Sequence, residues 1–179
     1  MKSVIAAITS AALVATDDAP AAGAPADGAR RFYAVYGTFH PSDGIPDRNA
    51  LVRYAPIISP SLERLFVQAG QAGAKFANAN KDSPPLIEGD LMTSNFEGAT
   101  STTVGDCAIK GRLATCKIDL VNDPGAKGEK PARWSDSLVL VDTDQGWRVD
   151  DVVYGATWAF GNKGRLSETL RHAIADAGS

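Results

Sequence analysis

Two adjacent carboxylates, Asp150 and Asp151, lie in a run that is otherwise rich in valine, tyrosine and tryptophan. Neighbouring side chains of a strand point to opposite faces, so one of the two is expected on the concave side of a sheet. A carboxylate in an apolar cavity has a raised pKa and can act as a general base or acid. If the protein is an enzyme, Asp151 is therefore the candidate base. The alternative, which we favour, is a structural carboxylate that pairs with Arg148 or Arg133 or caps a backbone group.

A second pair of carboxylates, Glu88 and Asp90, flanks Gly89 in a segment without regular periodicity. Oxygen ligands at this spacing could help to hold a cation. No further acidic residues follow at the spacing of a calcium loop, so we expect the pair to fix the loop by accepting backbone hydrogen bonds. We predict no metal site here.

The remaining polar residues give little support for a recognised catalytic set. His40 and His172 are the only histidines and have no partner at metal-ligand spacing. Ser94 and Ser101 lie near glycines, but the sequence contains no nucleophile elbow. Phosphate-binding and dinucleotide-binding loops are also missing, so no cofactor is expected.

Aromatic residues supply candidate binding groups, because tyrosine and tryptophan combine an apolar ring with a hydrogen-bond donor. Most aromatic side chains of a small domain belong to its core, so pocket lining is the less common role. The candidates for a binding site are Tyr33, Tyr36, Trp134, Trp147, Tyr154 and Trp158, together with the carboxylates Glu88, Asp90 and Asp151.

The N-terminus predicts export. Residues 4–15 form an apolar run after Lys2, and an Ala/Pro-rich stretch follows, which is the layout of a secretory signal over residues 1–22. The alternative is a short buried helix. Residues 23–28 are predicted as a flexible linker, and residues 29–179 as one domain. We expect a periplasmic or secreted location, without a membrane anchor after signal removal.

Helical patterns precede and follow the predicted sheet. Apolar residues at helical spacing begin near Ala29 and stop by Pro41. Asp47 is expected to cap a short helix that ends near Tyr54, and Ser59 with Pro60 is the strongest helix start in the chain. A long connection over residues 80–101 follows, and a last helix is predicted from about Ser167.

Four strands are predicted between these helices. Residues 103–110 and 113–121 flank a two-residue turn that begins with Gly111, as a tight hairpin requires. This register pairs Cys107 with Cys116 at a non-hydrogen-bonded position, where side chains approach most closely. A disulfide is therefore expected in an exported protein, the alternative being two free thiols. Two further strands are predicted over residues 134–141 and 147–158.

Composition agrees with a globular domain of 179 residues, because 44% of them are hydrophobic and 22% are charged. The net charge is −3 and the sequence has no run of basic residues, so nothing indicates a positively charged surface for nucleic acid. The order of elements predicts an α+β fold with helices on one face of a curved, mainly antiparallel sheet of about four strands, and such folds commonly hold a cavity between sheet and helices.

Several segments in order resemble a bacterial exported family known as domain of unknown function 3828: FYAVY from Phe32, PPLIEGDLMTSNFEG from Pro84, WSDSLVLV from Trp134 and WRVDDVVYGATWAFGNKG from Trp147. The resemblance covers about 130 residues, nearly the whole expected mature chain. It implies the cone-shaped fold of nuclear transport factor 2 and the steroid isomerases. It implies no activity, because the family itself is uncharacterised.

Three functions follow as hypotheses. The first is a non-catalytic exported binding protein for a small apolar molecule or an exported protein partner, with a homodimer as a further expectation. The second is an inhibitor or immunity protein that blocks an exported enzyme. The third is an isomerase or dehydratase that uses Asp151 as base and Tyr36 as hydrogen-bond donor, by analogy with enzymes of similar fold.

Overall fold

The computed structural model describes residues 23–38, 44–126 and 128–177. The described residues form four α-helices and one antiparallel sheet with the strand order β1-β2-β3-β4. The helices are α1 (Pro25–Tyr36), α2 (Arg48–Tyr54), α3 (Pro60–Ala79) and α4 (Leu166–Asp176). The strands are β1 (Ser101–Lys110), β2 (Leu113–Asn122), β3 (Ala132–Thr143) and β4 (Gly146–Val153). The predicted α+β class with a curved four-stranded sheet is confirmed.

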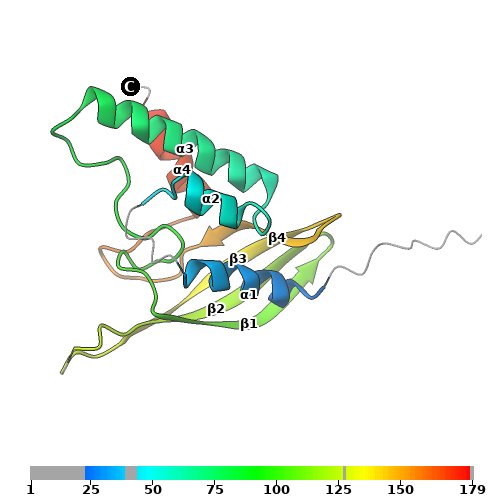
Figure 1. Ribbon diagram of the computed structural model, residues 1–179. Helices are drawn as coiled ribbons and strands as arrows, with labels where there is room; N and C mark the ends of the chain where they lie inside the picture. The colour runs from blue at the N-terminus through cyan, green and yellow to red at the C-terminus, as the bar shows by residue number, and fades with distance from the viewer. Residues whose placement is uncertain (1–22, 39–43, 127, 178–179) are drawn as a thin grey trace, which may run out of the picture.

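Helix α1 crosses the sheet and contacts all four strands, whereas α3 and α4 pack together beside β4 (Figure 1). Residues 25–28, which were expected in a flexible linker, form the first turn of α1 because Pro25 suits a first helical position. The predicted signal over residues 1–22 and the predicted helix end at Pro41 lie outside the described residues.

The two helix starts predicted from capping residues are confirmed. The Asp47 side chain accepts a hydrogen bond from the Ala50 backbone N–H at 2.7 Å, and Ser59 accepts one from Leu62 at 3.0 Å. Each side chain thus satisfies a backbone donor that the first helical turn leaves without an intrahelical partner.

The β1–β2 hairpin has the predicted register from its turn to Cys107, and the pairing shifts between Cys107 and Val104. Lys110 pairs with Leu113 across the turn, and Cys107 pairs with Cys116. The turn residue Gly111 has φ +62°, the left-handed conformation that such turns require. The two cysteines form a disulfide with a Cα–Cα distance of 4.0 Å, in agreement with a closely spaced cross-strand pair.

The last strand is shorter than predicted and is interrupted by a bulge. It ends at Val153 rather than at residue 158, and the alternation breaks at Asp150, where β4 carries one extra residue opposite β3. Such a bulge moves all later side chains to the other face. Val152 therefore lies buried opposite Leu138, on the face that uninterrupted alternation from Val149 would give to Val153.

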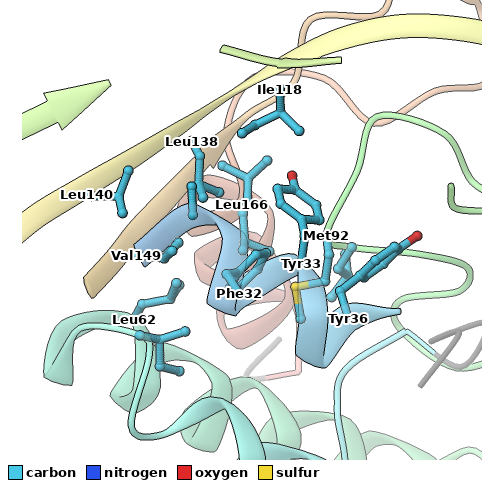
Figure 2. Packing of buried hydrophobic residues seen from close by; sticks show 14 of the residues in the cluster. Phe32, Tyr33, Tyr36, Leu62, Met92, Ile118, Leu138, Leu140, Val149 and Leu166 are labelled. Carbon is cyan, nitrogen blue, oxygen red and sulfur yellow. The ribbon is translucent and has the colours of Figure 1, made fainter. Parts of the chain in front are cut away.

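The core lies between α1 and the inner face of the sheet. Figure 2 shows Phe32, Tyr33 and Tyr36 projecting from α1 among apolar side chains of the sheet and of α3. Phe32 is fully buried and Tyr33 is 4% exposed. Packed side chains thus occupy the space between α1 and the sheet, where a cavity was expected.

Candidate functional site

The long connection between α3 and β1 enters the body of the protein. Its residues 91–94 are buried although they belong to neither a helix nor a strand. Backbone groups of a buried loop need hydrogen-bond partners, because an unsatisfied polar group is costly away from water. Two buried carboxylates, Asp90 and Asp136, accept the backbone N–H groups of Met92 and Ser94 in this segment.

Asp90 accepts hydrogen bonds from three directions. The Tyr36 hydroxyl of α1 donates to its Oδ2 atom, the Met92 backbone N–H donates to its Oδ1 atom at 2.5 Å, and the Thr93 hydroxyl lies 3.5 Å from Oδ2. The Tyr36 hydroxyl in turn accepts the Ala99 backbone N–H at 2.7 Å. One tyrosine thus ties two points of the loop, Asp90 and Ala99, to α1. The hydrogen-bonding role that we favoured for Asp90 is the one observed.

Burial raises the pKa of Asp90 to about 7, although the hydrogen bonds from Tyr36 and from Met92 and Thr93 act in the opposite direction. Burial also raises the pKa of Tyr36 far above its usual value, and the neighbouring Asp90 charge adds to this effect. Both side chains are 2% exposed. The pair is therefore sealed from solvent and acts as a structural contact.

Asp136 of β3 organises the second half of the network. Its Oδ2 atom accepts the Ser94 backbone N–H at 2.8 Å and the Trp134 indole N–H at 3.1 Å. Its Oδ1 atom accepts the Ser94 hydroxyl and, at 2.9 Å, the backbone N–H of Gly155. The Ser94 oxygen also accepts the N–H of Ala156 at 3.1 Å. We call these contacts of Asp136 and Ser94 the Asp136 node. It joins the loop to the residues that follow β4.

Residues 154–164 are held against the same loop. The Asn162 side chain donates to the carbonyl oxygens of Asp90 and Thr93 at 2.6 and 2.7 Å. The Tyr154 hydroxyl donates to the carbonyl of Leu91 at 2.7 Å. These hydrogen bonds join the two loops, and the tips of the loops lie beside the connecting loop of the β2–β3 hairpin.

A hollow of about 710 Å³ lies between these tips and the hairpin. Three aromatic side chains line it and are exposed: Phe96 by 48%, Trp158 by 37% and Phe160 by 93%. The ring of Trp158 packs edge-on against Trp134 at 5.2 Å, which connects the hollow to the Asp136 node. The remaining lining residues are Asn95, Glu97, Asn122, Pro124, Glu129, Lys130, Ala132 and Gly161.

The floor of the hollow continues the inner face of the sheet. Asn122 pairs with Ala132 two positions beyond the buried pair of Leu120 and Trp134. Because side chains alternate along a strand, Asn122 and Ala132 share the face of that buried pair. The volume lies within the range of small-molecule sites, and exposed aromatic side chains gathered at one place mark binding surfaces.

The structure places the predicted site residues in separate surroundings. Trp158 lines the hollow and Trp134 supports it, whereas Trp147 packs in the core under α1. Tyr33 is buried, and its hydroxyl has no hydrogen-bond partner among the described residues. Glu88 is exposed whereas Asp90 is buried, so the two carboxylates lie in different surroundings.

Asp151, the candidate base, holds the start of α4. It accepts the Ser167 backbone N–H at 3.0 Å and the Ser167 hydroxyl at 2.8 Å, and Arg165 lies 3.4 Å from its carboxylate. The N-cap residue Arg165 makes no side-chain cap of its own, so Asp151 provides that acceptor from β4. The backbone cap of the structural alternative is therefore observed, but the arginine beside Asp151 is Arg165 rather than the expected Arg148 or Arg133.

Sequence reasoning missed Asp136, Asn162, Phe96 and Phe160. The sequence does contain a signal for Asp136. It lies two positions from both Trp134 and Leu138, so its side chain points to the same apolar face of β3. An acid at such a position is expected to be a buried hydrogen-bond acceptor. No sequence signal brought Phe96 and Phe160 together, since 64 positions separate them.

Neither the family models nor the curated proteins compared with this sequence give a match. None of the helices within the described part of the chain has the length and apolar character of a membrane span.

Proposed function

We propose that this protein is a non-catalytic, exported binding protein that takes a small ligand with an apolar body in the hollow between Phe96, Trp158 and Phe160. The observation that carries the proposal is the exposure of these three rings around about 710 Å³ of open volume. Exposed aromatic side chains cost free energy in water, and a ligand that covers them recovers it.

The hydrogen bonds that hold the loops beneath the three aromatic rings support the same function. Asn162 holds the two loops together by partly buried hydrogen bonds, and Asp136 holds Ser94 by buried ones. The aromatic side chains therefore project from segments whose backbone is already ordered, which lowers the entropy cost of binding. The surroundings of Asp151 and Tyr36 favour binding over the isomerase hypothesis, because both groups are engaged in internal hydrogen bonds.

Export remains part of the proposal. It is supported by the disulfide between Cys107 and Cys116, since disulfides persist in oxidising compartments, and by the signal-like sequence of residues 1–22. The family resemblance stated above also favours a periplasmic location.

Native mass spectrometry of the oxidised protein, purified without refolding, tests the proposal. We expect a mass excess that disappears on denaturation, and we expect Phe160→Ser to lose it. Val52→Ser is the matched control, because Val52 is a 68% exposed apolar residue on α2, outside the lining of the hollow. An unliganded wild-type mass, or equal retention by both variants, would contradict the proposed function.

A further inference from the structure

The charged residues around the hollow indicate the kind of ligand. Among the described residues that line it, three are charged: Glu97, Glu129 and Lys130. Both carboxylates are exposed, and neither forms an ion pair with any described residue. The lining therefore carries two negative charges and one positive charge beside three aromatic rings.

Two nearby cations are directed elsewhere. Arg133 is next to Ala132 in β3, so alternation turns its side chain to the opposite face of the sheet. The Lys163 ammonium donates to the Ala156 carbonyl at 2.8 Å within its own loop. Neither is a lining residue of the hollow. Among the described lining residues, Lys130 therefore offsets only part of the negative charge of Glu97 and Glu129.

Aromatic faces and carboxylates together favour one ligand chemistry. A cation over a tryptophan or phenylalanine ring is attracted by the negative potential of the ring face, and a nearby carboxylate adds to the attraction. Building on the proposed function, we propose that the hollow binds a small organic cation, an alkylated ammonium group with an apolar body. Phe96, Trp158 and Phe160 contact the ammonium and its substituents, and Glu97 and Glu129 supply the countercharge.

A pair of probes with the same shape tests the charge. Choline carries a trimethylammonium group, and 3,3-dimethylbutan-1-ol carries a neutral tert-butyl group in its place. Binding of each is followed by NMR titration, with the indole N–H signal of Trp158 as the local reporter. We expect choline to bind about tenfold more tightly, and we expect this preference to shrink at high salt.

Variants separate the contributions of charge and ring. Glu97→Gln combined with Glu129→Gln should reduce the preference for choline over the alcohol, and the part of the preference that remains is the attraction of the cation to the ring faces. Phe160→Ser should weaken both probes. Asp144→Asn is the charge control, because this exposed acid lies in the β3–β4 turn, outside the lining of the hollow. The altered side chains are exposed, so folding is checked simply by near-ultraviolet circular dichroism.

Three results would overturn the inference. Equal affinity for the two probes would show that the hollow does not select a cation, and it would not contradict the proposed function. A preference for choline that is undiminished in the Glu97 and Glu129 double variant shows that these carboxylates do not supply the countercharge. The inference also fails if neither probe shifts the Trp158 signal; the mass experiment above then decides separately whether the hollow binds another ligand.

Discussion

The Tyr36 hydroxyl donates a hydrogen bond to the buried Asp90 carboxylate, across 54 positions of sequence. This contact joins α1 to the loop that bears Phe96. The pKa of Asp90 is about 7 in the folded protein because of burial, against an ordinary value of 3.8. The folded state therefore holds a proton at Asp90 that the unfolded chain has already released at mildly acidic pH.

This difference predicts a pH-dependent stability. A raised folded pKa contributes stability that is fully present below about pH 4 and is lost as the pH rises to about 7. We expect the contribution of Asp90 to the free energy of unfolding to fall by a few kcal/mol across this window. Urea unfolding at several pH values measures it. Asp90→Asn should flatten the dependence, and the exposed control Asp82→Asn should leave it unchanged; an unaltered slope in Asp90→Asn would contradict the assignment.

A glycine beside the same contact gives a second prediction. A Cβ atom at Gly98, whose φ is +78°, would lie 2.6 Å from both Asp90 Oδ2 and the Tyr36 hydroxyl oxygen. Gly111 also has a positive φ, but a Cβ atom there would meet nothing within 4 Å. Gly111→Ala should therefore cost about 1 kcal/mol from backbone strain alone, and Gly98→Ala distinctly more. Thermal unfolding of the two variants tests this, and equal losses would show that the contact adapts freely.

The Asp136 node predicts strong energetic coupling between Asp136 and Ser94. Asp136→Asn and Ser94→Ala should each destabilise the fold by about 1 to 3 kcal/mol, because each leaves buried donors without an acceptor. The double variant should lose less than the sum, since both changes remove the same hydrogen bonds. Chemical denaturation of the four proteins measures this coupling. Ser135→Ala provides a comparison, because Ser135 bonds Asp119 at 2.5 Å on the more exposed face; additive losses in the Asp136–Ser94 cycle would refute the node.

The disulfide predicts a bounded effect on stability. It joins residues nine positions apart, and closing so short a loop restrains the unfolded chain by about 2 to 3 kcal/mol. Cys107→Ala with Cys116→Ala should therefore lower the free energy of unfolding by roughly this amount and keep the same fold. Equilibrium unfolding with and without reductant gives the wild-type value for comparison. A variant that no longer folds would show that the bridge is needed to establish the register of the hairpin.

Local rules predicted those parts of the fold in which neighbouring residues decide the conformation. Ser59 and Pro60 mark a helix start whatever lies elsewhere in the chain, and Gly111 in a two-residue turn fixes the register that pairs Cys107 with Cys116. The bulge at Asp150 could not be predicted in this way. It depends on what β4 contacts on both sides, and alternation along the sequence contains no sign of the extra residue.

The candidate site depended on long-range packing to a greater degree. Trp158 was singled out for its residue type, but Phe96 and Phe160 acquire a role only when Asn162 and Ser94 bring their loops together. The prediction of a cavity between the helices and the sheet was wrong for a related reason. Tyr33 and Phe32 are large enough to fill the space between α1 and the sheet, and helical spacing gives no measure of that space.

The bulge in β4 places two consecutive carboxylates in contact with two different helices. Asp150 accepts the hydroxyl of Ser59, which begins α3, at 2.6 Å, and Asp151 accepts the backbone and hydroxyl of Ser167 at the start of α4. Backbone bonds between Val149 and residues 57 and 59 extend the sheet edge toward α3. Neither helix can then detach without disturbing the same short stretch of strand. Amide hydrogens in α3, β4 and α4 should accordingly exchange with solvent through one shared opening event, as a single cooperative folding unit assembled from segments about 100 residues apart.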